Sequence, residues 1–303
     1  MKHEYRGVWP TMIAAFDEAG KLDLDANKAI TEYLIGKGSD GLFAVCQSSE
    51  MFMLSTEEKV ILAKTVVEAA DNRVPVIASG HTSDAIEDQI AELKAVSETG
   101  VDAVVLVSNR LASVNDGSEV FISNLKRILE ALPGVEFGIY ECPYPFLRLL
   151  SDEELKWCAE SGRIVFLKDV SCNLEIETRR VKIVEGTALK LFNANTETLL
   201  GSLREGYHGY NGVMGNFHID LYKWLFDNFA ANPEKADGLQ AMLTEKSSIE
   251  KYAYPINAKY HMTRDGVDML LVSRRLPADA FTDQSRHLVE DLIVWETETR
   301  NQL

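Results

Sequence analysis

A lysine ends a run of apolar residues near the middle of the chain. Residues 164–168 read Ile-Val-Phe-Leu-Lys, and the four apolar residues before the lysine are typical of a strand buried on both faces. Burial removes the hydration of an ammonium group, so its pKa falls and the neutral amine becomes available near neutral pH. Such an amine can attack a carbonyl group and form a Schiff base. Lys168 is therefore a candidate nucleophile. A structural lysine paired with a buried carboxylate fits the same pattern, although Asp169 points to the opposite face of a strand.

Two other polar groups follow apolar runs. Tyr140 lies near the end of the run 136–142, where a phenol can relay a proton to a carbinolamine oxygen; a core tyrosine bonded to the backbone fits equally well. The turn Gln47-Ser48-Ser49 precedes a helix that begins near Ser55. Its backbone N–H groups can hold a carboxylate and the Ser48 hydroxyl can extend a proton relay, but a plain polar turn has the same composition.

These residues belong to a regular alternation of short apolar runs and amphipathic stretches. The runs are 8–16, 41–46, 75–80, 103–108, 136–142, 164–170, 189–195 and 209–215. Helical patterns cover 24–37 and 56–70, and Ser151-Asp152-Glu153-Glu154 is typical of a helix start. Strand followed by helix, eight times over about 220 residues, predicts an α/β fold of the (β/α)₈ TIM-barrel type. Catalytic groups of such barrels lie at the carboxyl ends of the strands, where the candidate residues fall.

The last part of the chain has a different pattern. Residues 218–303 show helical periodicity without a convincing strand, and Asn232-Pro233 and Tyr254-Pro255 interrupt it. We therefore expect residues 1–217 to form the barrel and residues 218–303 to form helices packed on it.

Composition excludes several functional classes. The net charge of −16 disfavours binding to nucleic acid or to an anionic membrane surface. No segment approaches the roughly 20 apolar residues that span a bilayer, and residues 1–5 carry no apolar signal region, so we expect a cytoplasmic protein. The cysteines match no metal-ligand spacing, which favours free thiols, no metal site and no cofactor; they are Cys46, Cys142, Cys158 and Cys172.

Taken together, the motifs resemble those of the dihydrodipicolinate synthase / N-acetylneuraminate lyase family of class I aldolases. The resemblance covers nearly the whole chain and rests on segments distributed along it. They are Gly7-Val8-Trp9-Pro10, Phe16-Asp17, Gly20-Lys21-Leu22-Asp23, Gly38-Ser39-Asp40-Gly41-Leu42, Leu54-Ser55-Thr56-Glu57-Glu58-Lys59, Tyr140-Glu141-Cys142-Pro143, Leu167-Lys168-Asp169-Val170-Ser171, Gly206-Tyr207-His208-Gly209, and Gly212 with Asn216.

The resemblance implies roles for individual residues. Lys168 would form the Schiff base with pyruvate or another 2-keto acid, and Tyr140 would relay protons. The turn at Gln47-Ser48 would hold the carboxylate of the keto acid. The resemblance also implies a homotetramer, or a homodimer if the interface has changed.

Three departures from the family pattern bear on the substrate. The second-strand turn reads Cys46-Gln47-Ser48-Ser49-Glu50 in place of Gly-(Ser/Thr)-Thr-Gly-Glu. Pro145 stands where the synthases have an arginine that grips the carboxylate of the aldehyde substrate. Leu111 stands at about the position of the tyrosine that the synthases take from a neighbouring subunit.

We therefore expect a lyase that cleaves or condenses a 2-keto acid and an aldehyde, acting on a compound like a 2-keto-3-deoxy sugar acid. Arg110, Gln47, Glu141 and Asn211 would shape the pocket of the second substrate. Three alternatives stay open: 4-hydroxy-tetrahydrodipicolinate synthase with Arg110 as the carboxylate anchor, a dehydratase of the family, and a non-catalytic barrel that binds a keto acid.

Overall fold

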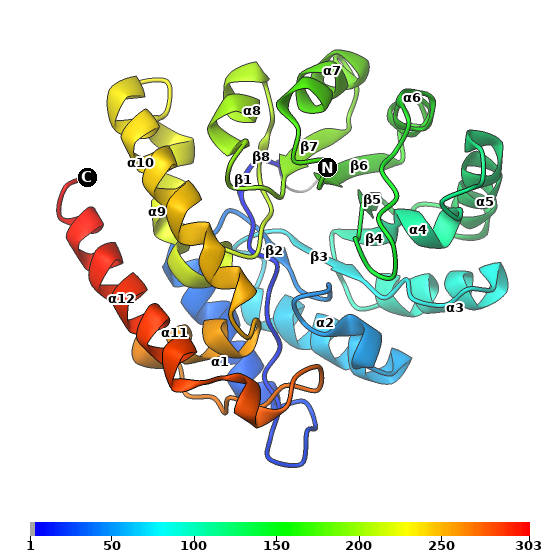
Figure 1. Cartoon of the computed structure of the whole chain (residues 1–303). Helices are drawn as coiled ribbons and strands as arrows, with labels where there is room; N and C mark the ends of the chain where they lie inside the picture. Colours follow the sequence, from blue (N-terminus) through cyan, green and yellow to red (C-terminus); the bar gives the residue numbers. More distant parts are fainter. Residues whose placement is uncertain (1–3) are drawn as a thin grey trace.

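Eight parallel strands form the centre of the molecule (Figure 1). The structure is a computed structural model that describes residues 4–303; residues 1–3, part of the segment used for the localisation prediction, lie outside the described residues. The strands are β1 (Gly7–Val8), β2 (Leu42–Phe43), β3 (Val76–Ser79), β4 (Ala103–Val107), β5 (Phe137–Tyr140), β6 (Ile164–Asp169), β7 (Lys190–Asn193) and β8 (Gly209–Tyr210). The sheet order is β1-β8-β7-β6-β5-β4-β3-β2, and a parallel bridge between Thr11 and Phe43 joins its two edges. The predicted (β/α)₈ barrel is confirmed.

Helices alternate with the strands and surround them (Figure 1). They are α1 (Leu24–Gly36), α2 (Thr56–Ala70), α3 (Ile86–Ser97), α4 (Ser108–Leu111), α5 (Ser118–Ala131), α6 (Asp152–Glu160), α7 (Leu174–Val184), α8 (Leu199–Glu205), α9 (Gly215–Asn228), α10 (Pro233–Lys246), α11 (Ile256–Arg264) and α12 (Asp283–Arg300). Short 3₁₀ turns occur at η1 (Met51–Met53), η2 (Ser247–Lys251) and η3 (Ala278–Ala280). None of the helices in the described part of the chain is both long and apolar enough to cross a membrane.

Two helix starts have the capping boxes that their sequences indicate. Ser55 accepts a hydrogen bond from the backbone N–H of Glu58, whose carboxylate accepts from the N–H of Ser55. Ser151 and Glu154 make the same reciprocal pair at the start of α6. Each box satisfies two N–H groups that an isolated helix end leaves unpaired, so local sequence fixes where α2 and α6 begin.

The C-terminal helices α10, α11 and α12 lie together on one side of the barrel, next to α9 (Figure 1). The predicted division between residues 217 and 218 falls inside α9, which is interrupted at His218 (φ −132°, ψ 58°). The division of the chain at that residue stays a prediction.

Aromatic side chains fill the interior of the barrel below the predicted reaction centre. Trp9, Phe166 and Phe192 are fully buried, with ring centroids 4.7–5.7 Å apart. Phe166 lies two residues before Lys168 on β6, so both side chains point into the barrel and Lys168 lies nearer the carboxyl end.

Candidate active site

Lys168 lies on β6 with only 4% of its surface exposed. Among the described residues, no carboxylate forms an ion pair with its ammonium group, and the nearest aromatic ring is that of Tyr140, whose centroid is 4.6 Å from Nζ. Burial lowers the pKa of Lys168 to about 8. An appreciable minority of the amine is therefore neutral close to physiological pH, which gives the site the carbonyl-attacking form that an ordinary lysine almost lacks.

Asp169, the neighbouring carboxylate, faces the outside of the barrel, as its place on the strand predicts. It pairs with Arg180 of α7 (Nη1 to Oδ2, 2.6 Å) and accepts a hydrogen bond from the Tyr207 hydroxyl at 2.5 Å. Arg180 also makes two hydrogen bonds to Glu141, at 2.6 and 3.0 Å. These buried groups tie α7 to the carboxyl ends of β5 and β6, the two strands that carry Tyr140 and Lys168.

Tyr140 and Lys168 are register partners on adjacent parallel strands, so their side chains point to the same side of the sheet. The Tyr140 hydroxyl donates to Gln47 Oε1 at 3.1 Å. Burial raises the pKa of Tyr140, which keeps the phenol protonated and able to donate.

The turn after β2 is held by a serine side chain. Ser49 Oγ accepts from the N–H of Cys46 and donates to the carbonyl oxygen of the same residue, both at 2.8 Å. Glu50 adopts a left-handed conformation (φ 61°) where the turn closes. This arrangement presents Gln47 and Ser48 to the interior, and Ser48 Oγ donates to Thr11 Oγ1 at 3.1 Å.

A cavity of about 250 Å³ joins these groups at the carboxyl ends of the strands. Of the predicted residues, Lys168, Tyr140, Gln47 and Ser48 line it. The other lining residues are Thr11, Cys46, Val213, Glu250, Lys251, Tyr254 and Arg275. A smaller adjoining hollow of about 110 Å³ shares Gln47 and Arg275 and includes Phe52, Met53 and Tyr144.

Four of the predicted substrate-binding residues are not among those that line the cavity. The Ser49 hydroxyl is hydrogen-bonded to the backbone of the turn. The carboxylate of the fully buried Glu141 is bound to Arg180. Asn211 donates to the carbonyl oxygen of Trp9 at 2.7 Å. Arg110 pairs with Asp84 at 2.5 Å and lies 5.9 Å from the ring of Phe52. Each of these four side chains is thus bonded within the barrel or its loops, and their part in substrate binding stays a prediction.

Sequence reasoning missed the C-terminal side of the cavity, which η2 and the segments after it supply. Glu50 positions part of this side, because its carboxylate accepts from the Ser273 hydroxyl at 2.9 Å and from the N–H of Arg275 at 2.7 Å. Thr11 follows the first strand, so the strand-end rule identifies it in hindsight. No local pattern marks Tyr254 or Arg275 as lining residues.

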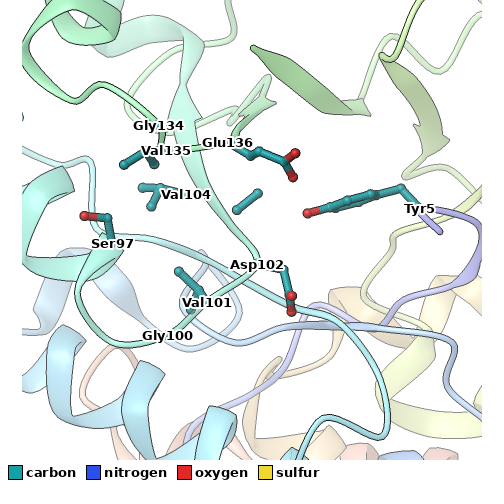
Figure 2. Close-up of a pocket in the computed structure, with 10 residues that line it drawn as sticks. Tyr5, Ser97, Gly100, Val101, Asp102, Val104, Gly134, Val135 and Glu136 are labelled. Carbon is teal, nitrogen blue, oxygen red and sulfur yellow. The ribbon is translucent and has the colours of Figure 1, made fainter. Parts of the chain in front are cut away.

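The barrel has a second and larger cavity, of about 460 Å³, at its opposite end. It lies at the amino ends of β4 and β5, and Tyr5, Asp102 and Glu136 contribute polar groups to it. Figure 2 shows the Tyr5 hydroxyl pointing into this cavity. None of the residues lining it is one of the predicted catalytic residues, so its size does not make it the reaction centre.

The described residues contain no group of histidines, cysteines and carboxylates that could hold a metal ion. All four cysteines are free thiols. Cys46 and Cys142 flank the turn at Gln47, and burial raises the pKa of both thiols. Their protonated state leaves the amine of Lys168 as the stronger nucleophile of the site.

Comparisons with known proteins identify the family of the chain. The model of the dihydrodipicolinate synthetase family matches residues 4–294. The chain is 27% identical over 288 residues to the 4-hydroxy-tetrahydrodipicolinate synthase of Bacillus subtilis, covering 93% of this chain and 96% of that protein. It is 24% identical over 242 residues to the enzyme of the same name from Porphyromonas gingivalis, covering 79% and 80%.

Solved structures show the same fold. The dihydrodipicolinate synthase of Bacillus anthracis superposes with a TM-score of 0.86 at 24% identity, over 95% of this chain and 97% of that one. YagE, a prophage protein of the dihydrodipicolinic acid synthase family from E. coli K12, solved in complex with pyruvate, has a TM-score of 0.86 at 19% identity, over 97% and 99%. The chain therefore belongs to the dihydrodipicolinate synthetase family and is a lyase of the class I aldolase type.

Proposed function

We propose that the protein cleaves or condenses a 2-keto acid such as pyruvate with an aldehyde, through a Schiff base on Lys168. One observation carries the proposal: a buried lysine that forms no ion pair with a carboxylate among the described residues reaches a cavity with its pKa lowered to about 8. The iminium formed there withdraws electrons from the carbon–carbon bond that breaks or forms. Tyr140 and Ser48 would move protons, and the turn at Gln47 and Ser48 would hold the carboxylate of the keto acid.

The cavity supports a polar second substrate. Gln47, Thr11 and Glu250 offer amide, hydroxyl and carboxylate groups that suit the hydroxyls of a 2-keto-3-deoxy sugar acid. Arg110, Glu141, Asn211 and Ser49 are not among the residues that line it, so the lining differs in composition from the predicted one. A homotetramer or homodimer remains our proposal for the assembly, to be checked by light scattering.

The second candidate is the synthase reaction that the curated relatives are named for. It is favoured by two cavity-lining cations, Lys251 and Arg275, either of which can meet the carboxylate of aspartate semialdehyde, whereas Arg110 is paired with Asp84. A coupled assay of that condensation separates the two candidates. A family dehydratase would instead release water from the sugar acid without releasing pyruvate.

The test is to incubate the protein with pyruvate, reduce it with borohydride and map the adduct by mass spectrometry. We expect a pyruvyl adduct on Lys168 and none in the Lys168→Ala variant, which should also lose retro-aldol activity while keeping its fold. An adduct elsewhere, or retained activity in that variant, would contradict the proposal.

Lys259 provides an internal control for this experiment. Burial lowers its pKa to about 8 as well, but Glu50 lies 3.6 Å from its Nζ and the group donates to the carbonyl oxygen of Val272. It does not line the cavity. Modification of Lys168 and not Lys259 would show that access to the cavity, together with a low pKa, selects the reactive amine.

A further inference from the structure

Tyr254 places a phenol in the cavity from the C-terminal part of the chain. It lies between η2 and α11 and lines the same cavity as Lys168 and Ser48. Its hydroxyl oxygen accepts a hydrogen bond from Asn216 Nδ2 at 3.1 Å. Asn216 is fully buried and also donates to the carbonyl oxygen of Thr11 at 2.6 Å, so the donor is fixed in place.

The hydroxyl groups of Ser48 and Thr11 lie beside this phenol. Ser48 donates to Thr11 at 3.1 Å, and both side chains are buried. Burial raises the pKa of Tyr254, while hydrogen bonding to Ser48 and to Thr11 acts in the opposite direction. The three hydroxyls therefore form one cluster. Tyr254 is partly exposed, which gives the cluster a connection to solvent.

The other phenol of the cavity has no such connection. The Tyr140 hydroxyl donates to the side-chain carbonyl of Gln47. A side-chain amide is neither an acid nor a base near neutral pH, so a proton cannot pass through it as it passes along hydroxyls. Leu111, at about the position where the synthases' borrowed tyrosine would stand, is a fully buried apolar residue of α4.

We propose that Tyr254 is a catalytic residue that exchanges protons with the substrate oxygen and with solvent, and that Ser48 and Thr11 extend this relay inside the cavity. This inference rests on the proposed function. The relay would then come from the same chain as Lys168. Asn216, whose amide donates to the phenol oxygen, stabilises the phenolate that forms after each transfer.

The proton balance of Schiff-base formation can be followed on these groups. The neutral Lys168 amine forms a bond to C2, the carbonyl π bond breaks, and the oxygen takes the Tyr254 proton. The attached nitrogen then loses one proton, which returns to the phenolate through Ser48. Loss of the hydroxyl group takes a second proton from Tyr254 and releases water. The iminium remains, and one proton from solvent restores the phenol.

The test compares Tyr254→Phe with wild type and with Tyr252→Phe, a matched change at an exposed tyrosine outside the cavity. The rate of pyruvyl adduct formation on Lys168 is measured by quenching with borohydride. We expect Tyr254→Phe to slow it at least about 100-fold, with a smaller change in KM for pyruvate, and Tyr252→Phe to leave it unchanged. A rate within threefold of wild type, taken as roughly the error of such a comparison, overturns the inference.

A second variant tests whether Tyr254→Phe slows the reaction by removing a proton-transferring group or only by disturbing the structure. Tyr254→His keeps a group that transfers protons, so it should retain more of the rate than Tyr254→Phe and should move the pH profile towards the ordinary imidazole range. Equal rates in the two variants contradict a relay. If one of the two variants does not fold, the rate of the other relative to wild type still supports or overturns the relay.

The two proposals fail in different ways. If wild-type protein forms no adduct on Lys168 with any keto acid, the proposed function fails. If wild type forms the adduct and Tyr254→Phe forms it at the same rate, the function stands and only the relay is wrong.

Discussion

At the scale of the residue, two buried lysines show that a lowered pKa and access to a cavity are separate requirements for a reactive amine. Lys168 and Lys259 have the same lowered pKa, about 8, because both lose hydration on burial. Lys259 lies beside Glu50 and away from the cavity, whereas Lys168 lies against the ring of Tyr140 inside it. A low pKa makes an amine capable of attack, and access to a cavity decides whether it meets a carbonyl group.

The pH dependence of adduct formation follows from the same pKa. Below pH 8 the Lys168 amine is mostly protonated in the folded protein and cannot attack, and above pH 8 it is mostly neutral. We therefore expect the rate of pyruvyl adduct formation to rise about tenfold per pH unit up to near pH 8 and then to level off. Stopped-flow mixing with borohydride quench measures it, and a rate that continues to rise to pH 10 would mean that the lysine keeps its ordinary pKa.

At the scale of the element, the reaction centre depends on charges buried behind the strands. Arg180 of α7 neutralises Glu141, which follows β5, and Asp169 of β6, and all three side chains are at most 1% exposed. Removing one partner of such a group leaves uncompensated charge in a medium that solvates it poorly.

We expect Arg180→Met to lower the free energy of unfolding by about 3–5 kcal/mol. The matched control is Arg179→Met, because Arg179 pairs with Asp152 on the surface and such pairs contribute about 0–1 kcal/mol. Urea denaturation of both variants measures the difference. Equal losses would show that the buried group contributes no more than a surface ion pair.

Elements were easier to predict than the complete site, for a physical reason. Strand patterns and the capping boxes at Ser55 and Ser151 are interactions within a few residues, so the sequence displays them directly. The strand-end rule also located Lys168 and Tyr140, because a barrel brings those ends together. The strand-end rule by itself does not separate inward from outward residues, and the alternation that places Asp169 outwards also places Glu141 outwards, next to Arg180. The contact of Tyr254 with the cavity joins residues far apart in the chain, and no local pattern marks it.

At the scale of the whole molecule, the negative net charge repels an anionic substrate. The net charge is −16, yet Lys251 and Arg275 line the cavity. These cations supply the local attraction that the overall charge does not.

Arg275→Gln should therefore raise KM for pyruvate or for an anionic second substrate about 3- to 10-fold at low salt, equivalent to about 0.6–1.4 kcal/mol. The increase should shrink as salt screens the charge. Arg204→Gln is the control, because Arg204 pairs with Asp237 on the surface and its loss changes the net charge equally. If both variants respond alike, the overall charge and not the cavity cation sets the affinity.

The two sides of the cavity come from separate stretches of the gene. Lys168, Tyr140 and Ser48 are encoded within the barrel, whereas Glu250, Lys251, Tyr254 and Arg275 are encoded within a short stretch that follows it. Recombination that exchanges only that stretch between relatives would replace much of the substrate-facing surface and retain the Schiff-base lysine. Evolution, or a laboratory library that varies codons 250, 251 and 275 and keeps Tyr254, can then explore new aldehydes without rebuilding the step that activates the keto acid.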